Sequence, residues 1–229
     1  MTKDYYKFIK ELRLKRGLSQ LETAEKIGIS RSSYIGFEQG KNELSLLEAI
    51  KLSDLFGISL EEMRGGLKPN YAKYKQMILA YLRSGKGADG KIPKTKLAKM
   101  LYLADFAWFY EHLESMSGMP YRKIQYGPVP DNYFRAIDEL FEAGIIEIDK
   151  TTRDGVFFIS QTRSGEREKL SELNASEQKM IKDISAKWQG KRTQDIVKFT
   201  HDQLPYSICE ENEIIPYSLI TQEDPSHVY

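Results

Sequence analysis

The stretch from Gln20 to Gly40, QLETAEKIGISRSSYIGFEQG, predicts two short helices joined by a tight turn. Such a helix-turn-helix needs a small residue where the second helix crosses the first, and Ala24 supplies it. Gly28 supplies the turn residue, because glycine accepts a positive φ at little cost. Apolar side chains must fill the angle between the helices, and four are suitably spaced: Ile27, Ile29, Tyr34 and Phe37.

Three further helices are predicted around these two, two of them from helix-start signals and one from an amphipathic run. The Ser-x-x-Glu capping box, which satisfies free amides at a helix start, occurs at Ser19–Glu22, Ser45–Glu48 and Ser59–Glu62. Ser30 is a further N-cap candidate without the reciprocal glutamate. An amphipathic run, Tyr5–Arg16, precedes them, so the sequence predicts five short helices before residue 64.

The first of these helices has an apolar face and a basic face. Three apolar residues at helical spacing are expected to be buried: Phe8, Ile9 and Leu12. Three basic residues are expected to point outward: Lys10, Arg13 and Arg16.

A second domain is expected after the segment Arg64–Asn70, RGGLKPN, because two glycines and a proline interrupt the helical pattern. We therefore predict domains at residues 1–66 and 67–229. The second domain reads as mainly helical, with a central apolar helix at Lys94–Met116 and further helices near 71–85, 131–144, 176–188 and 193–204. Two short runs, Ile145–Ile148 and Val156–Ser160, predict one β-hairpin.

Composition limits where the protein works and what it binds. The chain has one cysteine, Cys209, and no run of 18 apolar residues, which favours a cytoplasmic protein that neither enters a membrane nor depends on disulfides. Residues 64–104 carry ten basic groups and one acidic group, and residues 201–229 carry six acidic groups and no lysine or arginine. The basic stretch favours a polyanion or an acidic partner.

The segment from about residue 4 to residue 63 resembles the lambda-repressor-like DNA-binding domains of the XRE family. In a helix-turn-helix the second helix lies across the DNA backbone and the third enters the major groove. Gln20 is then expected to donate to a phosphate, and Arg31 to contact guanine. The other expected DNA contacts are Ser32, Ser33, Gly36, Lys41 and Asn42. Because one such domain touches few base pairs, we expect a homodimer on a double-stranded DNA operator.

Three motifs in the second domain resemble the Panacea domain of SocA-like antitoxins, over roughly residues 71–220. They are KLAKMLYLAD (96–105), YGPVP (126–130) and THDQLPY (200–206). The resemblance implies an antitoxin that binds and silences a cognate toxin, while the helix-turn-helix represses their shared operon. Within these motifs Leu101, Asp105 and Pro128 are expected to be scaffold positions, with Asp105 paired inside the domain.

The toxin-binding surface stays open at this point. Exposed aromatic side chains make good interface anchors, and the candidates are Trp108, Phe109 and Tyr126. The basic stretch 86–99 could meet an acidic toxin surface or imitate nucleic-acid contacts in a nucleotide-directed toxin.

The sequence does not favour an enzyme. The three histidines are scattered, Cys209 lacks a partner at metal-ligand spacing, and no nucleophile or dinucleotide motif occurs, so we expect no catalytic residues, metal or cofactor. Two alternatives to the antitoxin remain: a phage-type or metabolic repressor whose second domain senses a small molecule, and an adaptor that delivers a partner to a protease.

Overall fold

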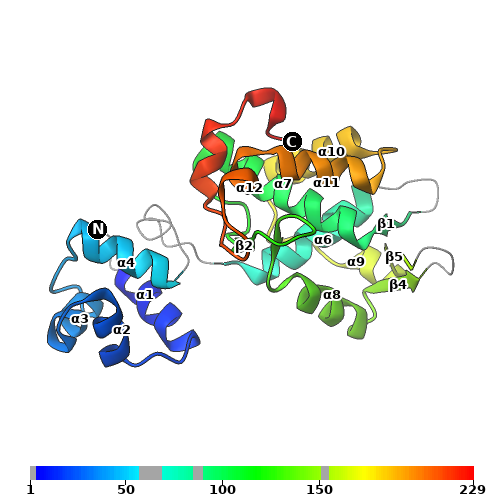
Figure 1. Cartoon of the computed structure of the whole chain (residues 1–229). Coiled ribbons are helices and arrows are strands. Elements are labelled where there is room, and N and C mark those ends of the chain that lie inside the picture. The colour runs from blue at the N-terminus through cyan, green and yellow to red at the C-terminus, as the bar shows by residue number, and fades with distance from the viewer. Residues whose placement is uncertain (1–3, 57–68, 85–89, 151–154) are drawn as a thin grey trace. The chain divides into compact units, whose positions relative to one another are not determined.

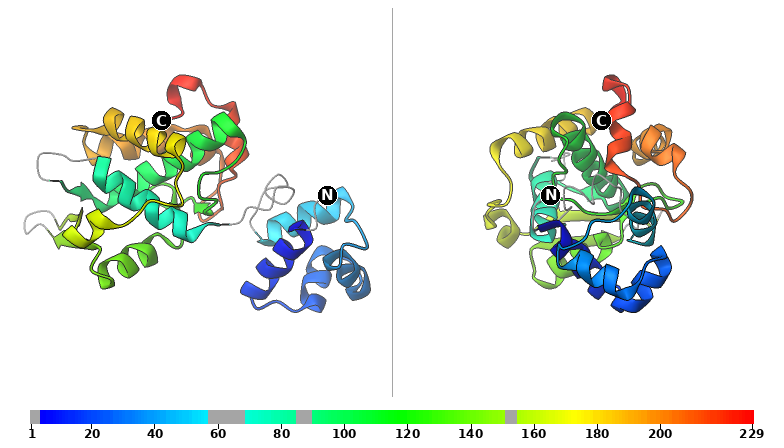
Figure 2. Two further views of the ribbon diagram at one scale, coloured as in Figure 1. Left: turned by 180° about the vertical axis from the view of Figure 1, so that it is seen from behind. Right: turned by 90° about the vertical axis from the view of Figure 1, so that its left-hand side faces the viewer.

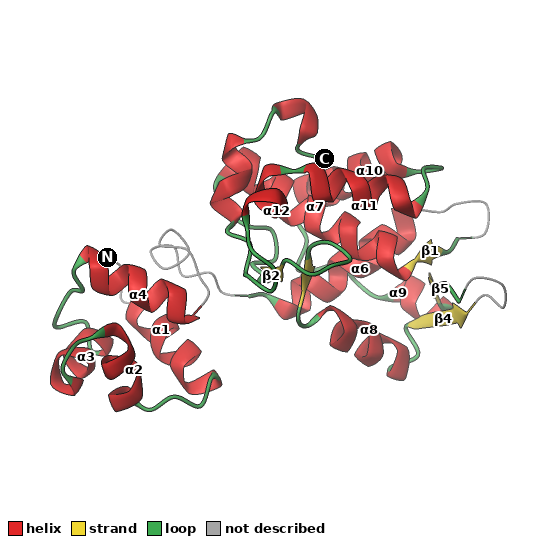
Figure 3. Ribbon diagram, in the orientation of Figure 1, coloured by secondary structure: helices red, strands yellow, loops and turns green. Residues whose placement is uncertain are grey.

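A computed structural model describes residues 4–56, 69–84, 90–150 and 155–229. The chain divides into two compact units, Met1–Lys68 and Pro69–Tyr229. Helices dominate both units, and the strands are short (Figure 3). Residues 64–68 of the predicted linker and the expected capping box at Ser59–Glu62 lie outside the described residues, so the boundary at residues 66 and 67 stays a prediction.

The first unit contains four described helices (Figure 1): α1 (Asp4–Lys15), α2 (Gln20–Ile27), α3 (Arg31–Glu38) and α4 (Leu46–Phe56). The capping boxes at Ser19–Glu22 and Ser45–Glu48 are both formed, and the Ser30 hydroxyl accepts the Ser33 amide at 3.1 Å. Gly28 ends α2 with φ 82°, in the left-handed conformation that the tight turn requires. These predictions from local sequence are confirmed.

The core of the first unit confirms that the expected apolar side chains pack between α2 and α3. Seven buried side chains form one cluster: Ile9, Ala24, Ile27, Tyr34, Phe37, Leu52 and Phe56. Leu12 and Ile29 are half-buried against it, whereas the side chain of Phe8 lies outside the described residues. Because Ala24 is fully buried, α3 can approach α2 closely.

Arg13 corrects the prediction that this side chain points to solvent. It is 6% exposed, and its guanidinium donates to both carboxylate oxygens of Glu38, at 2.6 and 3.2 Å. A third donor bonds the Leu18 carbonyl at 2.8 Å. The helical period placed Arg13 on the polar face, but the end of α3 lies over that face and supplies the carboxylate.

The second unit is larger. Its helices are α6 (Tyr71–Ser84), α7 (Lys94–His112), α8 (Tyr133–Glu142), α9 (Arg163–Arg167), α10 (Ala175–Trp188), α11 (Thr193–Asp202), α12 (Leu204–Ile208) and the 3₁₀ helices η1 (Tyr217–Gln222) and η2 (Pro225–His227). The predicted helices near 71–85, 176–188 and 193–204 are therefore confirmed to within a few residues.

Helix α7 is the centre of the second unit, as its composition predicts. All residues from Leu97 to Phe109 are buried, and α7 is covered by α6, α10, α11 and η1 (Figures 1 and 2). Asp105 is fully buried in this helix, and its carboxylate accepts hydrogen bonds from the Ser117 amide, the Ser117 hydroxyl and the Tyr121 hydroxyl. Burial raises the pKa of Asp105 to about 6, although these hydrogen bonds oppose the shift. The expected internal pairing of Asp105 is confirmed.

Two small sheets complete the second unit. The expected hairpin is formed by β4 (Ile146–Lys150) and β5 (Phe157–Gln161), which pair antiparallel with Ile148 opposite Ile159. Strand β1 (Ile92–Pro93) adds to the other edge of β5, and β2 (Tyr121–Arg122) pairs with β3 (Val129–Pro130).

Helix α8 begins at Tyr133, two residues after the start of the helix predicted near 131–144. Asn132 occupies the N-cap of α8 without a side-chain cap bond. The carboxylate of Asp131 instead accepts two hydrogen bonds from Arg122, at 3.0 and 2.9 Å. The competing guanidinium is brought close by β2, which the sequence did not predict.

Candidate functional site

The predicted DNA-reading face lies at the start of α3. Arg31, Ser32 and Ser33 are all exposed. The Ser30 hydroxyl lies 2.9 Å from that of Ser32 and 2.8 Å from that of Ser33, so one cap residue orders both. This arrangement leaves Arg31 as the long cationic side chain of the face, suited to bidentate contact with a guanine.

The absence of a side chain at position 36 has a structural reason that the sequence does not show. A Cβ built at Gly36 would lie 2.3 Å from Nδ2 and 2.9 Å from Cγ of Asn42. The backbone amides of Lys41 and Asn42 also donate to the Gly36 carbonyl, at 2.8 and 3.3 Å. The glycine therefore lets the chain after α3 fold back onto the helix and places two predicted phosphate contacts, both exposed, beside the reading face.

Gln20 is held in place by Glu38. Its side-chain amide donates to Oε2 of Glu38 at 2.9 Å, and the same carboxylate binds Arg13, so one acidic group joins α1, α2 and α3. Gln20 is half-buried and its amide carries a second N–H, which suits donation to a phosphate. Burial raises the pKa of Glu38, but the hydrogen bonds from Arg13 and Gln20 outweigh it, and the pKa lies below its ordinary value.

Sequence reasoning missed Glu38 as a positioning residue. The sequence gives little indication of an internal ion pair here, because a glutamate at a helix end usually faces water. The contact with Arg13 spans 25 residues, which no local pattern encodes.

Two of the three aromatic candidates for the toxin surface are not exposed. Trp108 and Phe109 are each 9% exposed; Trp108 stacks on His112, and Phe109 packs on Tyr217. The expectation that these two side chains form an exposed anchor is wrong, because η1 and the end of α7 cover them. Tyr126 is 69% exposed, as expected.

The three motifs of the second unit meet at one point. Lys99, from the first motif, is fully buried and donates to the carbonyl of Pro128, in the second motif, at 3.1 Å. A Cβ on Gly127 would lie 2.7 Å from Cε of Lys99 and 2.8 Å from Nε2 of His201, in the third motif. With φ 92° as well, only glycine fits at position 127.

The third motif also contacts the segment just before the second motif. The imidazole of His201 stacks on Tyr206 with ring centroids 4.3 Å apart, and the Tyr206 hydroxyl donates to the Ile124 carbonyl at 2.9 Å. The neighbouring Asp202 is exposed and pairs with Lys198, so His201 and Asp202 do not form a catalytic pair. Leu101 and Pro128 are buried, as expected of scaffold.

Lys99 is the unusual group in this cluster. Burial lowers its pKa to about 7, and burial together with the neighbouring Lys99 charge lowers the pKa of His201. An ammonium carries three donors, and one of them is used by the Pro128 carbonyl. A lysine within an otherwise apolar helical run was the signal available in the sequence.

In the described part of the basic stretch, Lys91 and Lys96 have partners inside the second unit. Lys91 pairs with Asp149 at 2.6 Å. Lys96 donates to the carbonyls of Trp188 and Lys191, at 2.7 and 2.6 Å.

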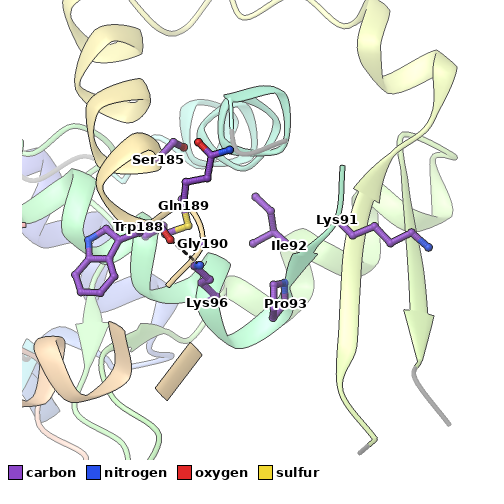
Figure 4. Close-up of a pocket in the computed structure, with 9 residues that line it drawn as sticks. Lys91, Ile92, Pro93, Lys96, Ser185, Trp188, Gln189 and Gly190 are labelled. Atoms are coloured by element: carbon purple, nitrogen blue, oxygen red, sulfur yellow. Dashed lines mark hydrogen bonds between the residues drawn. The ribbon is translucent and has the colours of Figure 1, made fainter. Parts of the chain in front are cut away.

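The small pocket beside Lys96, drawn in Figure 4, has a volume of about 80 Å³ and lies between the start of α7 and the end of α10. It is too small for a metabolite-sized ligand.

Within the described residues, no group of three or more histidine, cysteine, aspartate or glutamate side chains is arranged to hold a metal ion. Among the described helices, none has the length and apolar character needed to cross a membrane.

Family models match both units. Residues 9–63 match the helix-turn-helix model, and residues 97–205 match the model described as antitoxin SocA-like, Panacea domain. No solved structure is a significant match to the chain.

Curated relatives match over the first unit. An HTH-type transcriptional regulator of Methanocaldococcus jannaschii, itself uncharacterised, is 36% identical over 55 residues, which are 24% of this chain and 83% of that protein. HTH-type transcriptional regulator AnsR of Bacillus subtilis is 40% identical over 55 residues, 24% of this chain and 47% of AnsR. Cryptic phage CTXphi transcriptional repressor RstR of Vibrio cholerae is 33% identical over 55 residues, 24% of this chain and 50% of RstR.

These matches agree with the geometry of both units. The capped α2–Gly28–α3 unit with an exposed reading face corresponds to the matched helix-turn-helix segment, and the converging motifs lie in the other matched segment. The chain therefore belongs to the XRE-type helix-turn-helix transcriptional regulators and carries a SocA-like Panacea antitoxin domain after its DNA-binding domain.

Proposed function

We propose that this protein is the antitoxin of a toxin–antitoxin pair, which neutralises its cognate toxin by direct binding and represses its own operon. The observation that carries the proposal is the presence in one chain of an exposed α3 reading face and an antitoxin-type domain matched over residues 97–205. In this proposal residues 1–66 bind the operator and residues 67–229 bind the toxin.

Operator binding rests on the α3 face and the residues around it. Arg31 reads a base, Ser32 and Ser33 contact bases or phosphate, and Gln20, Lys41 and Asn42 position the unit on the backbone. A homodimer on a palindromic operator would supply the affinity that a single unit lacks. Sedimentation with and without operator DNA tests the dimer.

The Arg31→Ala variant tests the DNA-binding assignment. We expect operator affinity in a gel shift to fall by roughly 1–3 kcal/mol, since a bidentate base contact is lost. Arg163→Ala, which removes an exposed arginine of the second unit, is the control for a general loss of charge. Equal operator affinity of the Arg31 variant and the parent would show that Arg31 is not a base contact.

Co-expression tests toxin neutralisation. Each open reading frame beside this one is expressed alone and together with this protein, and growth is scored. A neighbour that is toxic alone, harmless with this protein and co-purified with it supports the proposal. The absence of any toxic neighbour contradicts it.

One observation favours the alternative of a small-molecule sensor. The second unit holds a groove of about 430 Å³ beside Lys99, within the size range of ligand pockets. A sensor would show a ligand-dependent rise in melting temperature and would have no toxic neighbour. A protease adaptor would instead accelerate the degradation of its bound partner.

A further inference from the structure

The groove beside Lys99 joins four elements of the second unit. The first turns of α7, the segment before β3, helix α8 and strand β5 all contribute to it. Its lining residues, among them Lys94, Lys99, Tyr126, Phe134 and Phe157, come from all four. They include two lysines and no carboxylate.

The rim of the groove is aromatic and open to solvent. Tyr126, Phe134 and Phe157 are 69%, 52% and 44% exposed. A clustered apolar patch of this kind marks an interaction surface rather than the ordinary exposure of single side chains. A small molecule in the groove would leave the outer faces of these rings in water, whereas a protein segment laid across the rim would cover them.

The charge around the groove is positive. The Lys94 ammonium lies 4.9 Å from the centroid of the Phe134 ring, and that of Lys150 lies 5.4 Å from the Phe157 centroid. Lys99 lines the groove with one donor bonded to the Pro128 carbonyl. Within the described part of the chain, none of these three ammonium groups forms an ion pair with a carboxylate, so the complementary partner is acidic.

We propose that this groove is the toxin-binding site: a toxin segment places large apolar side chains among Tyr126, Phe134 and Phe157, and an adjacent aspartate or glutamate carboxylate on Lys94. This inference rests on the proposed antitoxin function. It assigns the basic stretch to an acidic toxin surface, the first of the two roles that the sequence left open. It also gives the converging motifs a role, because Gly127 and Pro128 hold Lys99 at the groove.

Helix α8 offers a matched pair of variants. Phe134 and Phe141 are 52% and 50% exposed on the same helix, but only Phe134 lines the groove. Phe134→Ser tests the proposal and Phe141→Ser controls for the loss of an exposed ring. Lys94→Gln tests the charge, and Lys179→Gln, an exposed lysine of α10, is its control.

The first experiment selects displayed random ten-residue peptides on the immobilised full-length chain. We expect the selected peptides to carry a carboxylate beside large apolar residues, and to bind the Phe134→Ser and Lys94→Gln variants about tenfold more weakly. Binding to the two control variants should be unchanged. Peptides without acidic enrichment, equal binding to Phe134→Ser and Phe141→Ser, or no selected peptide at all would overturn the proposal.

The second experiment measures rescue of growth from the toxic neighbour. Phe134→Ser and Lys94→Gln should lose neutralisation, while Phe141→Ser and Lys179→Gln should retain it. Full neutralisation by the groove variants would show that the groove is not the toxin-binding site, while the proposed antitoxin function would still stand. If no neighbour is toxic, the antitoxin function fails and the groove is not a toxin-binding site, while the peptide selection still decides whether it binds acidic, apolar segments.

Discussion

At the residue scale, Gly36 shows how a missing side chain can serve a binding site. The sequence leaves this position of the predicted reading face of α3 without a side chain. In the structure Asn42 occupies that space, close enough that a Cβ at position 36 would displace it. In the proposed operator complex Arg31 would therefore carry the specificity of the face, while Gly36 places Asn42, a proposed phosphate contact.

The Gly36→Ala variant tests this arrangement. We expect melting temperature to stay the same or rise, because alanine favours the helix by about 1 kcal/mol and the amide of Asn42 can swing away. Operator affinity should fall to that of Asn42→Ala, and the double variant should bind no more weakly than either single one. If Gly36→Ala bound the operator with full affinity while Asn42→Ala bound it more weakly, Gly36 would not be what places Asn42. Gel shifts and thermal unfolding supply both measurements.

Glu38 makes the stability of the first unit depend on acid. Its pKa in the folded state is below the ordinary value of 4.5, so its stabilising effect is complete at neutral pH and is lost as the pH falls below about 4.5. Glu38→Gln should lower the free energy of unfolding at pH 7 by roughly 1–3 kcal/mol, since the buried Arg13 loses its counter-charge, and should weaken the dependence on pH between 5 and 3.

Circular dichroism of the whole chain measures this effect. Glu25→Gln, an exposed change on α2, is the matched control. Both tryptophans, Trp108 and Trp188, belong to the second unit, so their fluorescence should not respond to Glu38→Gln. An identical acid transition in the parent and the Glu38 variant would refute the role of this carboxylate.

At the scale of elements, the C-terminal η1 is part of the core of the second unit although the family match ends at residue 205. Tyr217 is 1% exposed and stacks on Phe106 of α7 with ring centroids 4.5 Å apart. Its hydroxyl donates to the Met119 carbonyl at 2.8 Å. Ile215 and Ile220, on either side, are fully buried. The central helix therefore depends on a segment more than 100 residues later in the chain.

Substitution of Tyr217 measures that dependence. Tyr217→Ala should destabilise the second unit by about 3–5 kcal/mol, as expected for removing a buried aromatic ring. Tyr217→Phe should cost only about 1 kcal/mol, because the ring stays and one hydrogen bond is lost. Tryptophan fluorescence during urea unfolding reports both. A Tyr217→Ala midpoint equal to that of exposed Ser207→Ala would mean that η1 does not support α7.

At the scale of the whole molecule, two compact units carry two binding surfaces of different chemistry. The first has a cationic and hydroxyl-bearing face suited to DNA, and the second has an aromatic groove whose lining includes two lysines. If both surfaces bind as proposed, a change in one unit should leave binding by the other intact.

Truncation to residues 67–229 tests this modularity. Expressed from an unrelated promoter, the fragment should still rescue growth from the toxin, because no predicted toxin contact lies before residue 67. Its tryptophan fluorescence should show the same urea midpoint as the full chain. Loss of rescue by a folded fragment would show that neutralisation needs both units.

The sequence alone determined the local features of this protein. The capped helices, the left-handed Gly28 and the apolar helix α7 follow from residues close together in the chain, whose conformational preferences are local. Both family resemblances also came from short motifs. Arg31, Ser32 and Ser33 are exposed as the helix-turn-helix pattern predicts.

Only the tertiary structure decided which distant side chains meet. Arg13 turned inward because Glu38 lies opposite it, and Trp108 and Phe109 are covered where an exposed anchor was expected. The convergence of Lys99, Gly127 and His201 joins residues up to 102 positions apart. Helical and strand periods report which face of an element is apolar, but burial and ion pairing depend on what the rest of the chain packs against that face.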